Sequence, residues 1–171
     1  SLVGSRVERK EDKRFLTGKG RYTADINITN QTYAVFVRSP HARAKIKKVD
    51  FSKASKAPGV VSILTGADIV NDKIGGLIAG WKIVSEDGTD MKVPAHPPLA
   101  SDAVNYVGDH VAVVIAESLD EAKAAVNLVD VDYKVLQGVT STADAMKSEK
   151  IYNDIDKNLC FDWLLGDRAK V

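Results

Sequence analysis

The sequence has few of the residues from which compact chemical sites are usually built. It contains one cysteine, Cys160, in 171 residues, so an internal disulfide and a cysteine-based metal cage are both excluded. The three histidines, His41, His96 and His110, are too far apart for a local metal motif, although folding could still bring them together. A structural or surface role is the simpler interpretation for each of them.

Long apolar runs are also missing. No stretch approaches the roughly 18 apolar residues that cross a bilayer, and residues 1–6 lack the apolar core of a signal peptide. We therefore expect a soluble, cytoplasmic protein with no membrane partner. A hydrophobic content of 44% in a chain of this length suits one globular domain.

Catalytic and cofactor motifs are absent as well. Thr17–Gly20 superficially resembles a phosphate loop, but the chain contains neither G-x-x-x-x-G-K-[ST] nor G-x-G-x-x-G between a strand and a helix. Its glycines are more simply explained by a turn with positive backbone dihedral angles. Glu117, Asp120 and Glu121 are explained by a helix start, and Cys160 lacks a basic context. We predict no catalytic, cofactor-binding or metal-binding residue.

The charge is unevenly distributed. Residues 1–56 hold 14 Lys or Arg against 5 Asp or Glu, whereas residues 57–171 hold 10 against 18. A basic segment can attract an acidic partner surface or a nucleic acid. Solvated faces remain the simpler interpretation, and nucleic acid is disfavoured because the nearby aromatic residues fit strand or core positions. The lysines in question are Lys45, Lys47, Lys48, Lys53 and Lys56.

Hydrophobic patterns predict alternating strands and short helices. In order, we expect strands at 32–38 and 44–50, a short helix at 51–57, a buried strand at 60–64, a helix at 65–70 begun by a capping-box variant, a hairpin-bearing irregular excursion at 71–98, and strands at 111–116 and 130–136. Between the last two strands, Ser118 and Glu121 form a capping box. The helix that follows is expected to bury Leu119, Ala122, Ala125, Val126 and Val129.

These elements predict an α+β fold with mixed sheets and two strand–helix–strand units. Beyond Gln137 the chain becomes small and polar, and an apolar cluster follows at 160–165. Such a cluster either packs on its own core or docks onto a partner surface that the chain does not contain. The sequence leaves both alternatives open.

Several strings, in matching order and spacing, resemble the N-terminal α/β hammerhead domain of the molybdenum-containing large subunit of the carbon monoxide dehydrogenase, aldehyde oxidase and xanthine dehydrogenase family. They are 11–22, 38–42, 58–61, 64–68 and 107–114. The resemblance extends from about Arg9 to Leu136. It implies a hammerhead domain at 1–140 and, at 141–171, an extension or linker toward a missing molybdenum-cofactor-binding domain.

The resemblance also implies a function. The chain would be a scaffold, inactive by itself, within an oxidoreductase that hydroxylates or oxidises a small substrate at a molybdenum cofactor. Electrons would leave through 2Fe-2S clusters and FAD on partner subunits or domains, and the catalytic residues would lie in later domains. The partners would be the remaining domains of the molybdenum subunit and the iron–sulfur and flavin subunits. The basic first third of the chain is a candidate face for contact with these partners.

Two alternatives belong to other classes. The same fold could serve as a free-standing binding or interaction module. An independent small hydrolase would need a converging nucleophile and base, which the sequence does not display. The excursion at 71–98, with Trp81 and Met91, departs from the family pattern, so its role is not predicted.

Overall fold

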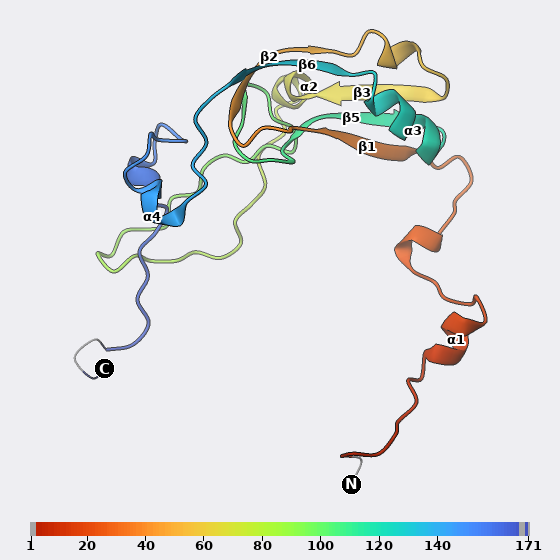
Figure 1. Cartoon of the computed structure of the whole chain (residues 1–171), viewed down its shortest axis with the longest axis horizontal. Coiled ribbons are helices and arrows are strands. Elements are labelled where there is room, and N and C mark those ends of the chain that lie inside the picture. The colour runs from red at the N-terminus through yellow and green to blue at the C-terminus, as the bar shows by residue number, and fades with distance from the viewer. Residues whose placement is uncertain (1–2, 168–169, 171) are drawn as a thin grey trace. The chain divides into compact units, whose positions relative to one another are not determined.

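The structure is a computed structural model that describes residues 3–167 and 170 (Figure 1). The outermost residues of the two predicted domains, 1–2, 168–169 and 171, lie outside the described residues. The chain divides into two compact units, Ser1–Gln31 and Thr32–Val171. Each unit is described by itself.

The first unit contains one turn of helix and one 3-10 turn. Helix α1 spans Asp12–Leu16 and η1 spans Thr23–Asp25. Between them, the Phe15 ring stacks on Tyr22 with centroids 5.5 Å apart. Gly18 has a φ of +68° directly after the helix, as expected for a glycine that ends a helix. The prediction of a positive dihedral angle is confirmed for Gly18 and wrong for Gly20, whose φ is not positive.

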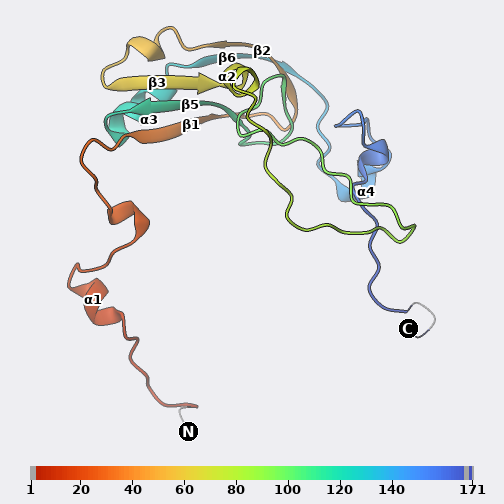
Figure 2. The ribbon, with the colours of Figure 1, turned by 180° about the vertical axis from the view of Figure 1, so that it is seen from behind.

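The second unit is built on two three-stranded antiparallel sheets. In the first sheet the order is β1 (Tyr33–Arg38), β5 (His110–Ala116), β3 (Val60–Thr65). In the second it is β4 (Ala103–Val104), β2 (Ala44–Asp50), β6 (Asp130–Val135). Figures 1 and 2 show β2 and β6 lying as a layer over β1, β5 and β3.

The predicted α+β class is confirmed, and the strand–helix–strand units are present with one correction. The first strand–helix–strand unit is β2–η2–β3, with η2 at Ala54–Lys56. The second strand–helix–strand unit is β5–α3–β6, with α3 at Leu119–Val126. Each unit crosses from one sheet to the other. The sheets are therefore antiparallel and not mixed, because no crossover joins parallel neighbours within a sheet.

Strand β5 is buried on both faces. On one face Val114 and Ala112 join Val37 of β1 and Ala125 of α3, and Val131 of β6 packs against this cluster. On the other face Val113 contacts Ile69 of helix α2 (Gly66–Asn71) and Leu99. A strand covered on both sides requires the continuous apolar run seen in the sequence.

Three residues expected to be buried are exposed. Leu119 is 41% exposed at the first position of α3, Val61 is 58% exposed on edge strand β3, and Val135 is 61% exposed at the end of edge strand β6. Periodicity identifies one side of an element, but burial also requires a neighbouring layer at that point. These three positions lie where no such layer covers them.

Both predicted helix starts are confirmed. Asp68 Oδ2 accepts from the Thr65 amide at 2.7 Å and from the Thr65 hydroxyl at 2.8 Å. At α3, the Ser118 hydroxyl accepts from the Glu121 amide at 3.2 Å and donates to the Glu121 carboxylate at 2.7 Å. The acidic residues at 120–121 are thus engaged in a helix start, as the macrodipole favours.

The Asp68 cap predicts a pH dependence. The hydrogen bonds from the Thr65 amide and hydroxyl lower the pKa of Asp68 below its ordinary 3.8. A carboxyl whose pKa is depressed by folding stabilises the fold above its unfolded pKa, and this stabilisation is lost as the pH falls through the folded value. Asp68→Asn should therefore flatten the loss of stability below pH 3.8 in urea unfolding.

The matched control is Thr65→Ser, which keeps both donors and should leave the acid dependence unchanged. If Asp68→Asn and the unchanged chain lose stability in parallel below pH 3.8, the cap does not carry this linkage.

The predicted hairpin in the excursion is confirmed. Val84 and Asp90 form an isolated antiparallel bridge, and the Ser85 amide donates to the Thr89 carbonyl at 2.7 Å. Gly88 occupies the turn with a φ of +84°. Further along, α4 spans Thr142–Ala145 and η3 spans Asp156–Asn158. Within the described residues, no helix is long and apolar enough to cross a membrane.

Candidate interaction surface and cavity

The structure gives each histidine its own aromatic partner. His110 stacks on Phe36 with centroids 4.2 Å apart, His41 meets the edge of Tyr133 at 5.0 Å, and His96 meets Tyr106 at 5.9 Å. Among residues 3–167 and 170, no three His, Cys, Asp or Glu side chains lie together as metal ligands would. Each histidine packs against an aromatic ring, and His96 also hydrogen-bonds the Tyr106 hydroxyl.

The lysines of β2 share their surface with carboxylates. Lys47 Nζ lies 3.7 Å from Asp132 of β6, and Lys48 Nζ lies 2.9 Å from Asp50. Hydrogen bonds to the Asp50 carboxylate, chiefly from Lys48 and secondly from Ser52, lower the pKa of that carboxyl. The sequence alone does not show that Asp132 of the neighbouring strand lies beside Lys47. This face carries charges of both signs.

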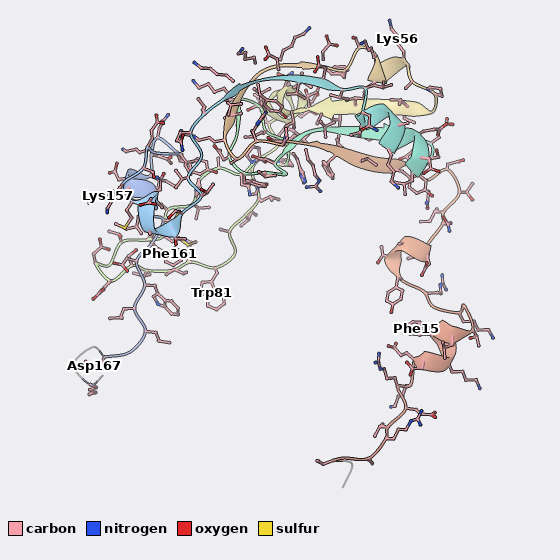
Figure 3. The ribbon with its side chains drawn as sticks, in the orientation of Figure 1. Phe15, Lys56, Trp81, Lys157, Phe161 and Asp167 are labelled. Carbon is pink, nitrogen blue, oxygen red and sulfur yellow. The ribbon has the colours of Figure 1, made fainter. Side chains whose placement is uncertain are left out.

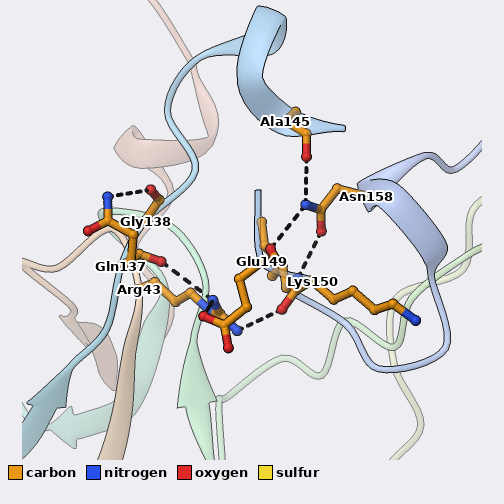
Figure 4. Close-up of polar contacts among 8 residues, drawn as sticks. Arg43, Gln137, Gly138, Ala145, Glu149, Lys150 and Asn158 are labelled. Carbon is orange, nitrogen blue, oxygen red and sulfur yellow. Dashed lines mark hydrogen bonds and ion pairs between the residues drawn. The ribbon is translucent and has the colours of Figure 1, made fainter. Parts of the chain in front are cut away.

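A nearly buried arginine attaches the segment after β6 to β2. The Arg43 side chain, 12% exposed, donates to the Lys150 carbonyl at 2.8 Å and lies 3.3 Å from the Glu149 carboxylate (Figure 4). It also donates to the Gln137 carbonyl at 3.4 Å. Shielded from water, this guanidinium has three partners at once. Arg43, the residue directly before β2, therefore holds this segment against the start of β2.

Asn158 closes the same segment on itself. Its Nδ2 donates to the carbonyls of Ala145 at 2.9 Å and Glu149 at 3.1 Å, and its Oδ1 accepts from the Ile151 amide at 2.8 Å (Figure 4). Ile155, only 2% exposed, is among the largest fully buried side chains of the chain. Residues 141–158 therefore have a fixed, packed conformation. The predicted boundary at residue 140 stays a proposal.

The apolar cluster at 160–165 is hydrogen-bonded to the hairpin of the excursion. The amides of Glu86 and Lys92 donate to the carbonyls of Asp162 at 2.8 Å and Cys160 at 2.9 Å. Trp163 lines a hollow together with Trp81, and Figure 3 labels Trp81 and Phe161. Even so, much of this surface is open to solvent: the exposed fractions are Ile78 93%, Trp81 80%, Phe161 39%, Trp163 57%, Leu164 38% and Leu165 83%.

We call this set, Ile78, Trp81, Phe161, Trp163, Leu164 and Leu165, the apolar surface. Trp81 and Trp163 line one hollow, and the other four side chains come from the same two segments of the chain. Large exposed apolar side chains of this kind usually mark an interface. Of the two alternatives that the sequence left open, docking onto a partner surface fits these exposures better than packing on the chain's own core.

A cavity of about 300 Å³ lies at the base of the excursion. Its wall is mainly apolar, and its polar lining converges on Asp109, which is only 7% exposed. Asp109 Oδ2 accepts from the Asn105 amide at 3.1 Å, and His96 Nε2 lies 3.1 Å from the Tyr106 hydroxyl. The lining residues used below are Ala95, His96, Asn105, Tyr106, Asp109 and Tyr152.

The negative charge of Asp109 affects the pKa of three tyrosines. Burial first, and then the Asp109 charge and hydrogen bond, raise the pKa of Tyr106. Burial and the same charge also raise the pKa of Tyr133 and Tyr152. The phenols stay neutral at physiological pH, so they surround the carboxylate without neutralising it.

Sequence reasoning missed this cavity. Asp109 lies inside a string that carries the family resemblance, but its neighbours come from positions 96, 105–106 and 152. Only tertiary structure brings those positions together. The one signal available in the sequence was an acidic residue, in Gly108-Asp109, directly before a strongly apolar strand.

Two stacked antiparallel sheets, joined by two strand–helix–strand units, define the fold of the chain from Thr32 onward. The chain belongs to the aldehyde oxidase and xanthine dehydrogenase a/b hammerhead domain family, whose sequence profile matches residues 17–137. The resemblance seen in the sequence is confirmed.

Individual relatives agree with this. The chain is 39% identical over 153 residues to the nicotine 6-hydroxylase large subunit of Paenarthrobacter nicotinovorans, a match that covers 90% of this chain and 18% of that protein. Quinoline 2-oxidoreductase from Pseudomonas putida 86 has a similar structure, with a TM-score of 0.75 and 35% identity over 88% of this chain and 18% of that one. A Cu,Mo-CO dehydrogenase has a TM-score of 0.70 and 32% identity over 92% and 19%.

The chain spans about a fifth of the length of the curated relatives it matches. What those whole proteins do therefore bears on this chain only through the proposal that follows.

Proposed function

We propose that this chain is the N-terminal scaffold domain of the large subunit of a molybdenum-dependent oxidoreductase of the carbon monoxide dehydrogenase, aldehyde oxidase and xanthine dehydrogenase type. The observation that carries the proposal is family membership combined with coverage of only a fifth of each large subunit. In this role the domain is inactive by itself. Its histidines contact aromatic rings, and its clustered carboxylates lie in the first turn of a helix.

The apolar surface supports a scaffold role. Large apolar side chains exposed as far as 93% at Ile78 and 80% at Trp81 gain stability when another surface covers them. About four fifths of each relative's length lies outside the part that this chain matches. We assign the remainder of the same subunit as the occupant of the apolar surface.

The molybdenum cofactor belongs to that remainder. The described residues do not fit it, because the histidines are separated from one another and Cys160 is the single cysteine. We further propose, from the family membership, that 2Fe-2S clusters and FAD reside on partner subunits or domains and that the assembled enzyme works in the cytoplasm without a nucleic acid or membrane partner.

The experiment is to isolate the native species from its source cells with an antibody to this chain. We expect a polypeptide whose mass is about five times 18.5 kDa and which co-purifies with molybdenum and iron. Polypeptide mass and elemental content are the measurements. A mock isolation with non-immune antibody sets the background for both metals.

The second candidate is a free-standing interaction module with the same fold, favoured by the extent of the apolar surface. A native species of 18.5 kDa without molybdenum or iron would establish this second function and exclude the first.

A further inference from the structure

The cavity around Asp109 has the makings of a binding site that the scaffold role does not use. It is enclosed enough to hold a small molecule or one long side chain, with about 300 Å³ of space. Apolar walls with a few convergent polar groups are typical of small-ligand sites. The question is which chemistry those polar groups select.

The buried carboxylate answers it. Asp109 is 7% exposed and accepts a hydrogen bond from a neutral group, the Asn105 amide, at 3.1 Å. Arg38 acts electrostatically on Tyr106, but its own side chain donates to the Gly108 carbonyl at 3.1 Å and lies over the Phe36 ring. No ion pair to Asp109 is found among the described residues. A buried carboxylate in an apolar wall attracts a cation more strongly than one in water.

The remaining lining fits a flat cation. The rings of Tyr106 and Tyr152 border the cavity and offer aromatic surface beside the carboxylate. Flat cations such as amidinium and guanidinium combine two parallel donors for a carboxylate with faces that pack on aromatic rings. The His96–Tyr106 hydrogen bond fixes one side of this wall.

We propose that the cavity binds an amidinium- or guanidinium-type cation, with Asp109 as the anion that receives it. The same chemistry can come from a free small molecule or from an arginine side chain in the remainder of the subunit. The inference concerns this chain's own residues and does not depend on the presence of molybdenum.

The test is a titration of the 171-residue chain with benzamidine, followed by two-dimensional NMR. Benzamide, which has the same ring and no charge, is the matched probe. We expect benzamidine to shift the amide signals of the cavity lining with a Kd of about 1 mM, and benzamide to bind at least about tenfold more weakly. Asp109→Asn should weaken benzamidine at least about tenfold, whereas Asp154→Asn, an exposed carboxylate on a neighbouring stretch, should not.

A second variant guards against loss of folding in Asp109→Asn. Ala95 is exposed at the rim of the cavity, so Ala95→Trp should close it without disturbing the core and abolish the benzamidine shifts. Equal binding of benzamidine and benzamide, or equal loss in Asp109→Asn and Asp154→Asn, would overturn the proposal.

The same probe added to the native species separates the two sources. Binding to both the chain and the native species indicates a site for a free cation. Binding to the chain alone indicates that a basic side chain of the remainder fills the cavity. Failure of the metal analysis would leave the titration of the chain unaffected, so the two proposals fail independently.

Discussion

Gly66→Ala should lower the free energy of unfolding by about 3 kcal/mol. A Cβ at Gly66 would lie 2.3 Å from the Ala100 carbonyl oxygen and 2.5 Å from Ser101 Cα. These are backbone atoms, and the Ala100 amide is held by a 2.7 Å hydrogen bond to the His110 carbonyl. Alanine normally improves a helix by up to about 1 kcal/mol, so the clash must outweigh that gain.

Urea unfolding of both proteins measures this difference. Gly75→Ala is the matched control, because its added Cβ would meet nothing within 4 Å, and it should be neutral or slightly stabilising. An unchanged urea midpoint in Gly66→Ala would mean that residues 100–101 do not cross the start of α2 as closely as the structure shows.

Ile155→Ala should cost about 2–4 kcal/mol, the usual effect of truncating a buried isoleucine. Ile155 is 2% exposed although it lies well beyond β6. The expected loss is large because the surrounding segment is fixed by Arg43 and Asn158 and cannot easily collapse into the space. Urea unfolding again provides the measurement.

Val107→Ala is the control for this truncation. Val107 is 66% exposed, so the change should stay within about 0.5 kcal/mol. If Ile155→Ala were equally harmless, residues 141–158 would behave as a linker, as the sequence suggested, and the fold would end near residue 140.

The sequence was a good guide wherever structure depends on neighbours along the chain. Thr65 with Asp68, and Ser118 with Glu121, predicted both helix starts because a capping box is complete within four residues.

Features that depend on distant residues were beyond sequence reasoning. Strand–helix–strand order fits both a parallel sheet and a crossing between two sheets, and only the pairing of β5 with β1 and β3 decides. Lys47 reads as part of a basic stretch until Asp132 is found across the sheet. Asp109 reads as a turn residue until Tyr106 and Tyr152 are seen around it.

The crossing of the two sheets has a consequence for how the chain folds. Strand β1 pairs with β5, so Tyr33 must find Ala116, and β2 pairs with β6, so Ala44 must find Val135. Neither sheet can be completed until most of the domain has left the ribosome. Chains dominated by such distant pairings fold slowly, because loop closure must precede the contacts that reward it. During that delay β1, β2 and β3 are unpaired strands, and the nascent chain passes through a stage in which chaperones would find it most exposed.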